Sequence, residues 1–140
     1  MSFSTRILFA MFFIAFTLGG CKKAIEKKKE NIIVAAMTSG RWRVASFTKD
    51  GSDITSSFTP YSFQYYENRT VDAINAGNVE KKGTWTEDIG SMKISAQFNG
   101  AVSPLDLING DWKFEASDWT YVVASQATSS GSKLMRLEKL

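Results

Sequence analysis

The chain has 140 residues, of which 13% are aromatic, and it carries a net charge of +3 with one cysteine and no histidine. This composition excludes histidine-based catalytic triads, Cys–His pairs and the usual zinc and copper sites. Two carboxylate pairs, Glu87 with Asp88 and Asp106 with Asp111, flank predicted turns and are interpreted as solvated or helix-capping residues. We therefore expect no enzyme activity, no metal and no cofactor.

The first twenty residues have the composition of an export signal. Arg6 is the only charge before Lys22, and the twelve residues 7–18 are apolar or small. This run is short for a bilayer, because a helix that spans about 30 Å of hydrocarbon needs about 20 residues. A positively charged start, a short apolar run and small residues before a cleavage point are typical of a secretory signal peptide. Residues 1–20 are therefore predicted to be a signal peptide.

The end of this segment, Leu18-Gly19-Gly20-Cys21, resembles a bacterial lipobox. In such signals the cysteine thiol receives a lipid, the peptide bond before it is cut, and the new amino group is acylated. Two or more lipid signals anchor a protein stably, so the resemblance implies a lasting membrane anchor on acylated Cys21. An uncleaved membrane anchor and a free buried cysteine are the alternatives.

Residues 21–37 form a basic tether. Five lysines and two glutamates lie between Lys22 and Met37, a net charge of +3, whereas residues 38–140 have a net charge of −1. The positive charge lies beside the anchor, which favours anionic lipid head groups over nucleic acid as its partner. A solvated spacer is the alternative. Residues 32–37 are expected to form a helical turn that packs against the domain.

Residues 38–140 are predicted to form one domain with a single core. Period-two patterns separated by turn residues indicate eight strands at 41–47, 61–66, 70–76, 79–87, 92–98, 111–117, 119–125 and 133–140. The longer connections 49–60 and 102–111 each predict a short helical turn, the second with Ser103 as N-cap and Pro104 at its first position. An even number of antiparallel strands can close and so remove exposed edges. The predicted fold is all-β, an eight-stranded antiparallel up-and-down barrel.

Alternation within each strand predicts the inward side chains. The first strand aligns Trp42, Val44 and Ser46, and a later one aligns Trp119 with the residues at 121 and 123. A barrel of eight strands has an interior that side chains fill or that holds one small ligand. The aromatic and apolar residues predicted to bind such a ligand are Phe63, Tyr65, Trp85, Ile94, Phe98, Phe114 and Tyr121. A solid core made of the same residues is the alternative.

Lys81 shares the face of Val79 and Trp85 in the predicted strand 79–87. If this face points inward, Lys81 lies near the rim of the barrel, where it can pair with an anionic head group. The alternative is that the lysine extends its ammonium group into water.

The order of several motifs resembles a known family. Gly40-Arg41-Trp42 opens the first strand, and Gly83-Thr84-Trp85 repeats the G-x-W pattern 43 residues later. With the lipobox and the strand pattern, residues 40–140 resemble bacterial lipoproteins that have a lipocalin-like domain. The resemblance implies that Trp42 plugs the barrel base and that an arginine near the last strand packs over it. Arg136 is the candidate, although alternation places its neighbours inward. Unlike secreted lipocalins, the chain lacks disulfides.

Together these features predict a lipid-anchored envelope protein whose barrel binds a small hydrophobic or amphipathic ligand. Lys22, directly after the cysteine, indicates the outer membrane, because in familiar lipoprotein sorting an aspartate there favours the inner membrane. The alternative is a non-enzymatic structural or interaction lipoprotein. Its filled barrel would dock on other envelope proteins through a surface that includes Tyr66 and Trp119. The expected partners are the membrane, a small apolar ligand and an envelope protein, and not nucleic acid.

Overall fold

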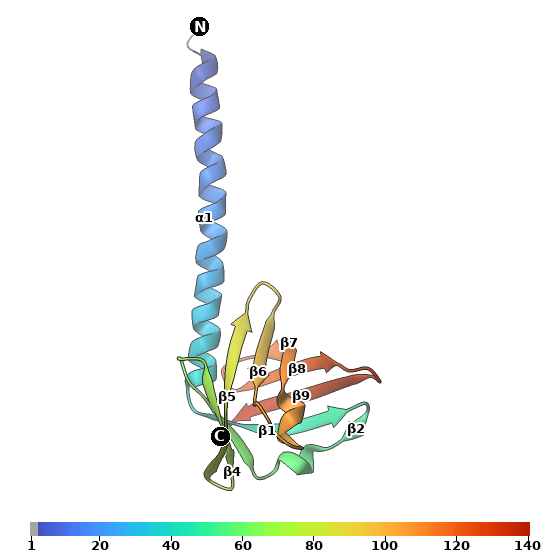
Figure 1. Ribbon diagram of the computed structural model, residues 1–140. Helices are drawn as coiled ribbons and strands as arrows, with labels where there is room; N and C mark the ends of the chain where they lie inside the picture. Colours follow the sequence, from blue (N-terminus) through green and yellow to red (C-terminus); the bar gives the residue numbers. More distant parts are fainter. Residues whose placement is uncertain (1–2) are drawn as a thin grey trace.

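The computed structural model describes the backbone of residues 3–140 and the side chains of residues 20–140. One long helix, α1 (Phe3–Thr38), projects from a β-barrel (Figure 1). The side chains of the apolar run 7–18 lie outside the described residues, so the signal peptide stays a prediction. Within the described part of the chain, no helix is both long enough and apolar enough to cross a membrane.

Eight strands close into an antiparallel barrel, as the sequence predicts. They follow one another around the sheet in chain order, and the pairing of β1 with β9 completes the ring. A two-residue strand, β2, pairs only with the end of β1. The strands are β1 (Arg41–Lys49), β2 (Ser52–Asp53), β3 (Tyr61–Tyr65), β4 (Thr70–Asn75), β5 (Asn78–Asp88), β6 (Lys93–Gln97), β7 (Gly110–Ser117), β8 (Tyr121–Ala127) and β9 (Ser132–Lys139).

Two short 3₁₀ turns lie in the two long connections, where helical turns were predicted. The turn η1 (Thr55–Phe58) follows β2, and η2 (Leu105–Ile108) precedes β7. The predicted cap of the second turn is wrong, because η2 begins at Leu105 after Pro104, and no side chain caps it. Both turns lie at the end of the barrel where β1 ends, which we call the mouth. The opposite end, where β1 begins, is the base.

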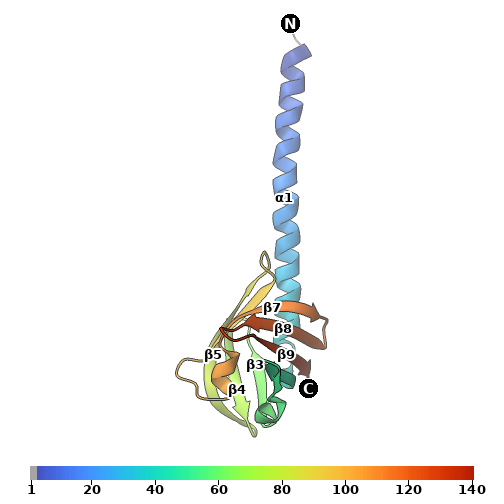
Figure 2. The same ribbon diagram turned by 90° about the vertical axis from the view of Figure 1, so that its right-hand side faces the viewer.

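The base is closed by the last turns of α1. Ile33 and Val34 pack against the barrel core, and Met37 is buried in it. The indole Nε1 of Trp42 donates a hydrogen bond to the carbonyl oxygen of Met37 at 2.9 Å. The rest of the helix leads away from the barrel in both views (Figures 1 and 2). All core residues and the residues packed on them lie between Ile33 and Leu137, so a chain that begins at Lys22 contains the complete core.

Two predicted inward faces are wrong, that of β1 after Val44 and that of β8; Trp42 and Val44 are buried as predicted. In β1, a bulge between Val44 and Ser46 shifts the register against β9, and Phe47 rather than Ser46 is buried. One extra residue in a strand reverses the side to which the following side chains point. In β8, Val122 and Ala124 point inward and Tyr121 does not, since these two residues lie opposite the buried Leu137 and Met135 of β9.

Candidate functional site

A chain of aromatic rings fills the barrel from the mouth inward. Successive ring centroids lie between 4.8 and 6.4 Å apart, within the range of favourable ring contacts. The chain contains, in order of contact, Phe47, Phe58, Tyr61, Phe63 and Phe98. These side chains occupy the middle of the barrel themselves.

Five of the seven residues predicted to bind a ligand lie in this core. They are at most 9% exposed and belong to one cluster: Phe63, Tyr65, Trp85, Ile94 and Phe98. Tyr65 meets Trp85 edge-on, with ring centroids 5.5 Å apart. Burial raises the pKa of the Tyr65 hydroxyl. Their inward orientation is confirmed, and they contact one another across the barrel.

The other two predicted residues lie elsewhere. Phe114 is half-buried and, with Ile33 and Val122, lines a cavity of only about 30 Å³ beside α1. Tyr121 carries the guanidinium group of Arg136 over its ring, 4.2 Å from the centroid. Tyr121 is therefore separate from the core cluster, because the even-numbered residues Val122 and Ala124 of β8 point inward instead of the predicted odd-numbered ones.

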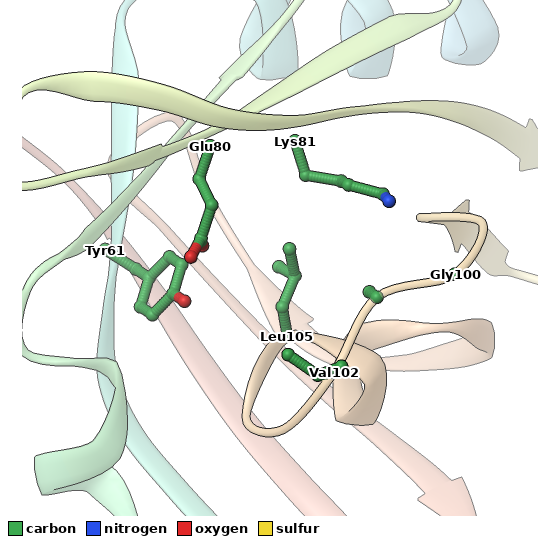
Figure 3. Close-up of a pocket in the computed structure, with 7 residues that line it drawn as sticks. Tyr61, Glu80, Lys81, Gly100, Val102 and Leu105 are labelled. Atoms are coloured by element: carbon green, nitrogen blue, oxygen red, sulfur yellow. The ribbon is translucent and has the colours of Figure 1, made fainter.

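The open space of the barrel lies at the mouth. A cavity of about 220 Å³ opens between the start of β3, the start of β5 and the connection from β6 to β7 (Figure 3). Its lining combines a phenol, two opposite charges and an apolar wall. The lining residues include Tyr61, Glu80, Lys81, Gly100, Val102 and Leu105. Among the described residues, no group of three or more His, Cys, Asp or Glu side chains could hold a metal ion.

A bulge brings two consecutive charged residues to this cavity. The pairing of β4 with β5 shifts between Ala73 and Ile74, which lie opposite Lys81 and Val79, so Glu80 is the extra residue. In a regular strand, neighbouring side chains point to opposite faces. The bulge lets both Glu80 and Lys81 line the mouth, while Val79 is half exposed.

The two charges differ in their partners. Burial is the main cause that raises the pKa of the Tyr61 hydroxyl, and a hydrogen bond with Glu80 raises this pKa further. Glu80 is exposed at the rim, beside Tyr61. Lys81 is half-buried, and its Nζ lies 3.6 Å from the position that a Cβ on Gly100 would occupy. Within the described residues Lys81 forms no ion pair (Figure 3).

The cation over the base tryptophan is not the predicted one. Lys139 lies directly opposite Trp42 in the β1–β9 pairing, and its Nζ is 5.1 Å from the ring centroid. The prediction that Arg136 packs over Trp42 is wrong, because the register places Arg136 opposite Ser46. The strand alternation that put Arg136 outside is confirmed by its contact with Tyr121.

The other two buried tryptophans also have a cation above the ring. Lys133 lies 5.2 Å from the Trp112 ring centroid and donates a hydrogen bond to the Leu107 carbonyl oxygen at 2.8 Å. Burial lowers the pKa of Lys133. The guanidinium group of Arg69 lies 5.1 Å from the Trp85 centroid.

Arg69 joins a charged cluster that sequence reasoning missed. It forms an ion pair with Glu87, whose side chain is only 5% exposed, and lies 3.9 Å from Glu30 of α1. The interpretation of Glu87 as a solvated turn residue is therefore wrong. The sequence did contain a signal for this burial, because Glu87 lies two residues after Trp85 and strand alternation places both side chains on the same, inward face. The Oε2 atom of Glu87 is buried without a hydrogen-bond partner.

Comparison with solved structures identifies the architecture. A lipocalin-like protein from Bacteroides uniformis superposes with a TM-score of 0.53 at 13% identity, covering 74% of this chain and 98% of that chain. The fold is lipocalin-like. A DUF4847 family protein from Bacteroides vulgatus gives a TM-score of 0.54 at 11% identity, covering 76% of this chain and 96% of that one.

A third similar structure is Japanin from Rhipicephalus appendiculatus, bound to cholesterol. It gives a TM-score of 0.52 at 11% identity and covers 75% of this chain and 77% of that chain. No protein-family model and no curated protein matches the sequence. At these identities the likeness concerns the fold alone, so the chemistry of the site has to be argued from the residues of this chain.

Proposed function

We propose that this chain is a lipid-anchored envelope protein of the outer membrane whose barrel binds a small amphipathic anion at its mouth. The observation that carries the proposal is the mouth cavity, which is lined both by Lys81, a residue without an ion pair among the described residues, and by the apolar side chains of Val102 and Leu105 (Figure 3). A carboxylate would pair with the ammonium group, and a short hydrocarbon body would lie on the apolar wall. Binding sites for small molecules combine a mostly apolar lining with a few polar groups in this way.

The size of the cavity limits the ligand. Drug-sized ligands occupy clefts of about 300–1,000 Å³, and the mouth cavity has about 220 Å³. The aromatic chain behind it leaves the ligand at the rim. The cholesterol bound to Japanin supports the capacity of this architecture for apolar ligands, but in this chain we expect a smaller molecule.

The test uses octanoate as the probe, measured by displacement of a fluorescent anionic naphthalene dye. Replacing Lys81 by Gln removes one charge-assisted contact, of about 1.5 kcal/mol, and is expected to weaken octanoate binding about ten-fold. Lys82→Gln is the matched control, since Lys82 is the next residue and its side chain is 80% exposed outside the cavity. Equal affinity of the two variants, or no octanoate binding by the unmodified protein, would contradict the proposal.

A binding role rather than an enzymatic one is supported by the composition, because the chain has no histidine and a single cysteine. The anchoring part of the proposal rests on Cys21 and the segment before it. Cys21→Ala is expected to abolish labelling by an alkyne fatty acid and to leave the precursor at full length. Labelling that persists in this variant would exclude Cys21 as the acylated residue.

A second candidate function is supported by the filled interior. A barrel packed with aromatic side chains can serve as a rigid module that docks on other envelope proteins. Trp119 is 53% exposed, and the exposed Tyr66 donates a hydrogen bond to Asp72 at 3.0 Å. In this case, a crosslinker placed next to Trp119 in intact cells should capture a defined protein, and Trp119→Ser should abolish the capture while Lys81→Gln leaves it unchanged.

A further inference from the structure

The described part of α1 carries an apolar stripe on the face turned away from the barrel. Cys21, Ile25, Lys28 and Ile32 follow the i, i+4, i+7, i+11 spacing of one helix face. Ile25 is 56% exposed and Ile32 is 45% exposed. Met37, by contrast, is buried in the barrel base. Ile25 and Ile32 therefore lie outside the buried core that Met37 belongs to.

The β5–β6 hairpin extends this stripe. It points along α1 and lies next to the helix in both views (Figures 1 and 2). Between the hairpin tip and the helix lies a groove of about 190 Å³ with an almost entirely apolar lining. Ile32, Ile33, Ile89 and Met92 line this groove together with Lys29, and Met92 is 46% exposed. Ile32 belongs to both the stripe and the groove, so the two apolar regions adjoin, with Lys29 beside them.

The lysines of this segment divide between two faces of α1: Lys27 pairs with Glu30 at 3.2 Å on the face toward the barrel, and three others lie along the apolar surface. Lys28 lies within the stripe, and Lys22 and Lys29, seven residues apart, follow one edge of it. The two acidic residues of the segment, Glu26 and Glu30, fall on the face toward the barrel, where Glu30 lies 3.9 Å from Arg69. An apolar stripe with lysines within it and along one edge, and with both acidic residues on the opposite face, matches an anionic bilayer surface, where apolar side chains enter the interface and lysines meet lipid phosphates.

We propose that α1 and the β5–β6 hairpin form a second, non-covalent membrane contact that lays residues 22–32 along an anionic bilayer. Cys21 lies on the same face, so the acyl chains of the proposed anchor would enter the bilayer from this contact. The contact would fix the orientation of the barrel relative to the lipid. The inference goes beyond ligand binding at the mouth and does not depend on it.

One acidic residue, Asp88, lies at the hairpin tip, where its carboxylate would approach the anionic bilayer. Asp88 turns back onto Ser91, accepting hydrogen bonds from its backbone nitrogen at 3.1 Å and its hydroxyl group at 2.8 Å. Lys93 follows on the same hairpin. The carboxylate is thus held by the turn itself.

The test uses the chain from Lys22 to Leu140, which contains the complete core and no cysteine to carry a lipid. Its partition is measured by co-sedimentation with vesicles of equal parts phosphatidylglycerol and phosphatidylcholine, and with phosphatidylcholine alone. We expect binding to the mixed vesicles that weakens as salt rises, because salt screens the lysines. Replacing Lys28 and Lys29 by Gln should lower the partition by about five-fold for each lysine.

The apolar half of the contact is tested with Ile32→Ser and Met92→Ser together, which should lower the partition about ten-fold. The matched control is Leu134→Ser, because Leu134 is 44% exposed on β9 near the mouth. Lys113→Gln, on β7, controls for net charge. Two results would overturn the proposal. One is equal vesicle binding by the Ile32→Ser, Met92→Ser double variant and by Leu134→Ser, and the other is no binding of the unmodified chain to anionic vesicles. Thermal unfolding of each variant checks that it is folded.

Discussion

Gly83 lies where β5 comes close to the backbone of β6 and the ring of Phe98, and its replacement tests the packing described above. It shares the inward face of β5 with Trp85. A Cβ at this position would lie 2.5 Å from the carbonyl oxygen of Gln97 and 2.7 Å from the ring of Phe98. Contacts under 3.0 Å are essentially never made by real Cβ atoms. The G-x-W motif at this site therefore requires glycine for close approach of the strands.

The size of the effect follows from what can move. The Phe98 ring is fully buried, and the Gln97 carbonyl belongs to the backbone of β6, which pairs with β5 at Thr84. Neither group can move away from an added Cβ without separating β5 from β6 or displacing core side chains. Overpacking of this kind costs about 1–3 kcal/mol, so we expect Gly83→Ala to lower the free energy of unfolding by about 2 kcal/mol.

Urea unfolding followed by tryptophan fluorescence measures this change. The midpoint should fall by about 1 M, given slopes of about 1–3 kcal/mol per molar urea for small proteins. Gly90→Ala is the matched control, because a Cβ there meets nothing closer than Asp88 Oδ1 at 3.5 Å. Phe98→Leu added to Gly83→Ala should not restore stability, since the carbonyl contact remains. A Gly83→Ala variant within about 0.5 kcal/mol of the unmodified protein would refute the reasoning.

Two further predictions concern charged groups. Arg69→Met should destabilise the protein by about 3 kcal/mol, because it leaves the buried carboxylate of Glu87 without its cation. Urea unfolding should show that adding Glu87→Gln recovers part of this loss. Additive effects of the two substitutions on the free energy of unfolding would exclude an interaction between the two side chains. Hydrogen bonds from Ser130 and then Thr128 lower the pKa of Asp50 below its ordinary value of 3.8. The folded state then gains stability from this carboxylate above about pH 4 and loses it as the pH falls through the lowered pKa. Asp50→Asn should therefore make the urea midpoint less sensitive to acid between about pH 4 and pH 2, and an unchanged acid dependence would contradict this assignment.

Local patterns were sufficient for much of this protein. Alternating apolar residues and turn residues predicted the eight barrel strands, because both signals arise within a few residues of one another. Phe63 and Tyr65 were placed inward by the same alternation, and both are buried. The candidate site was only partly predictable. Lys81 lies at the rim as expected, whereas the position of Glu80 depends on a bulge that local sequence patterns do not predict.

Sequence alone thus determined the closed antiparallel barrel and most of its aromatic core, since both follow from the period of a strand. The tertiary structure decided which cation covers Trp42, because that contact depends on the register between β1 and β9, the first and last strands of the chain. It also decided that Glu87 is buried beside Arg69, which approaches it from the turn before β4. Such contacts depend on strand register, and a shift of one residue exchanges the two faces of a strand.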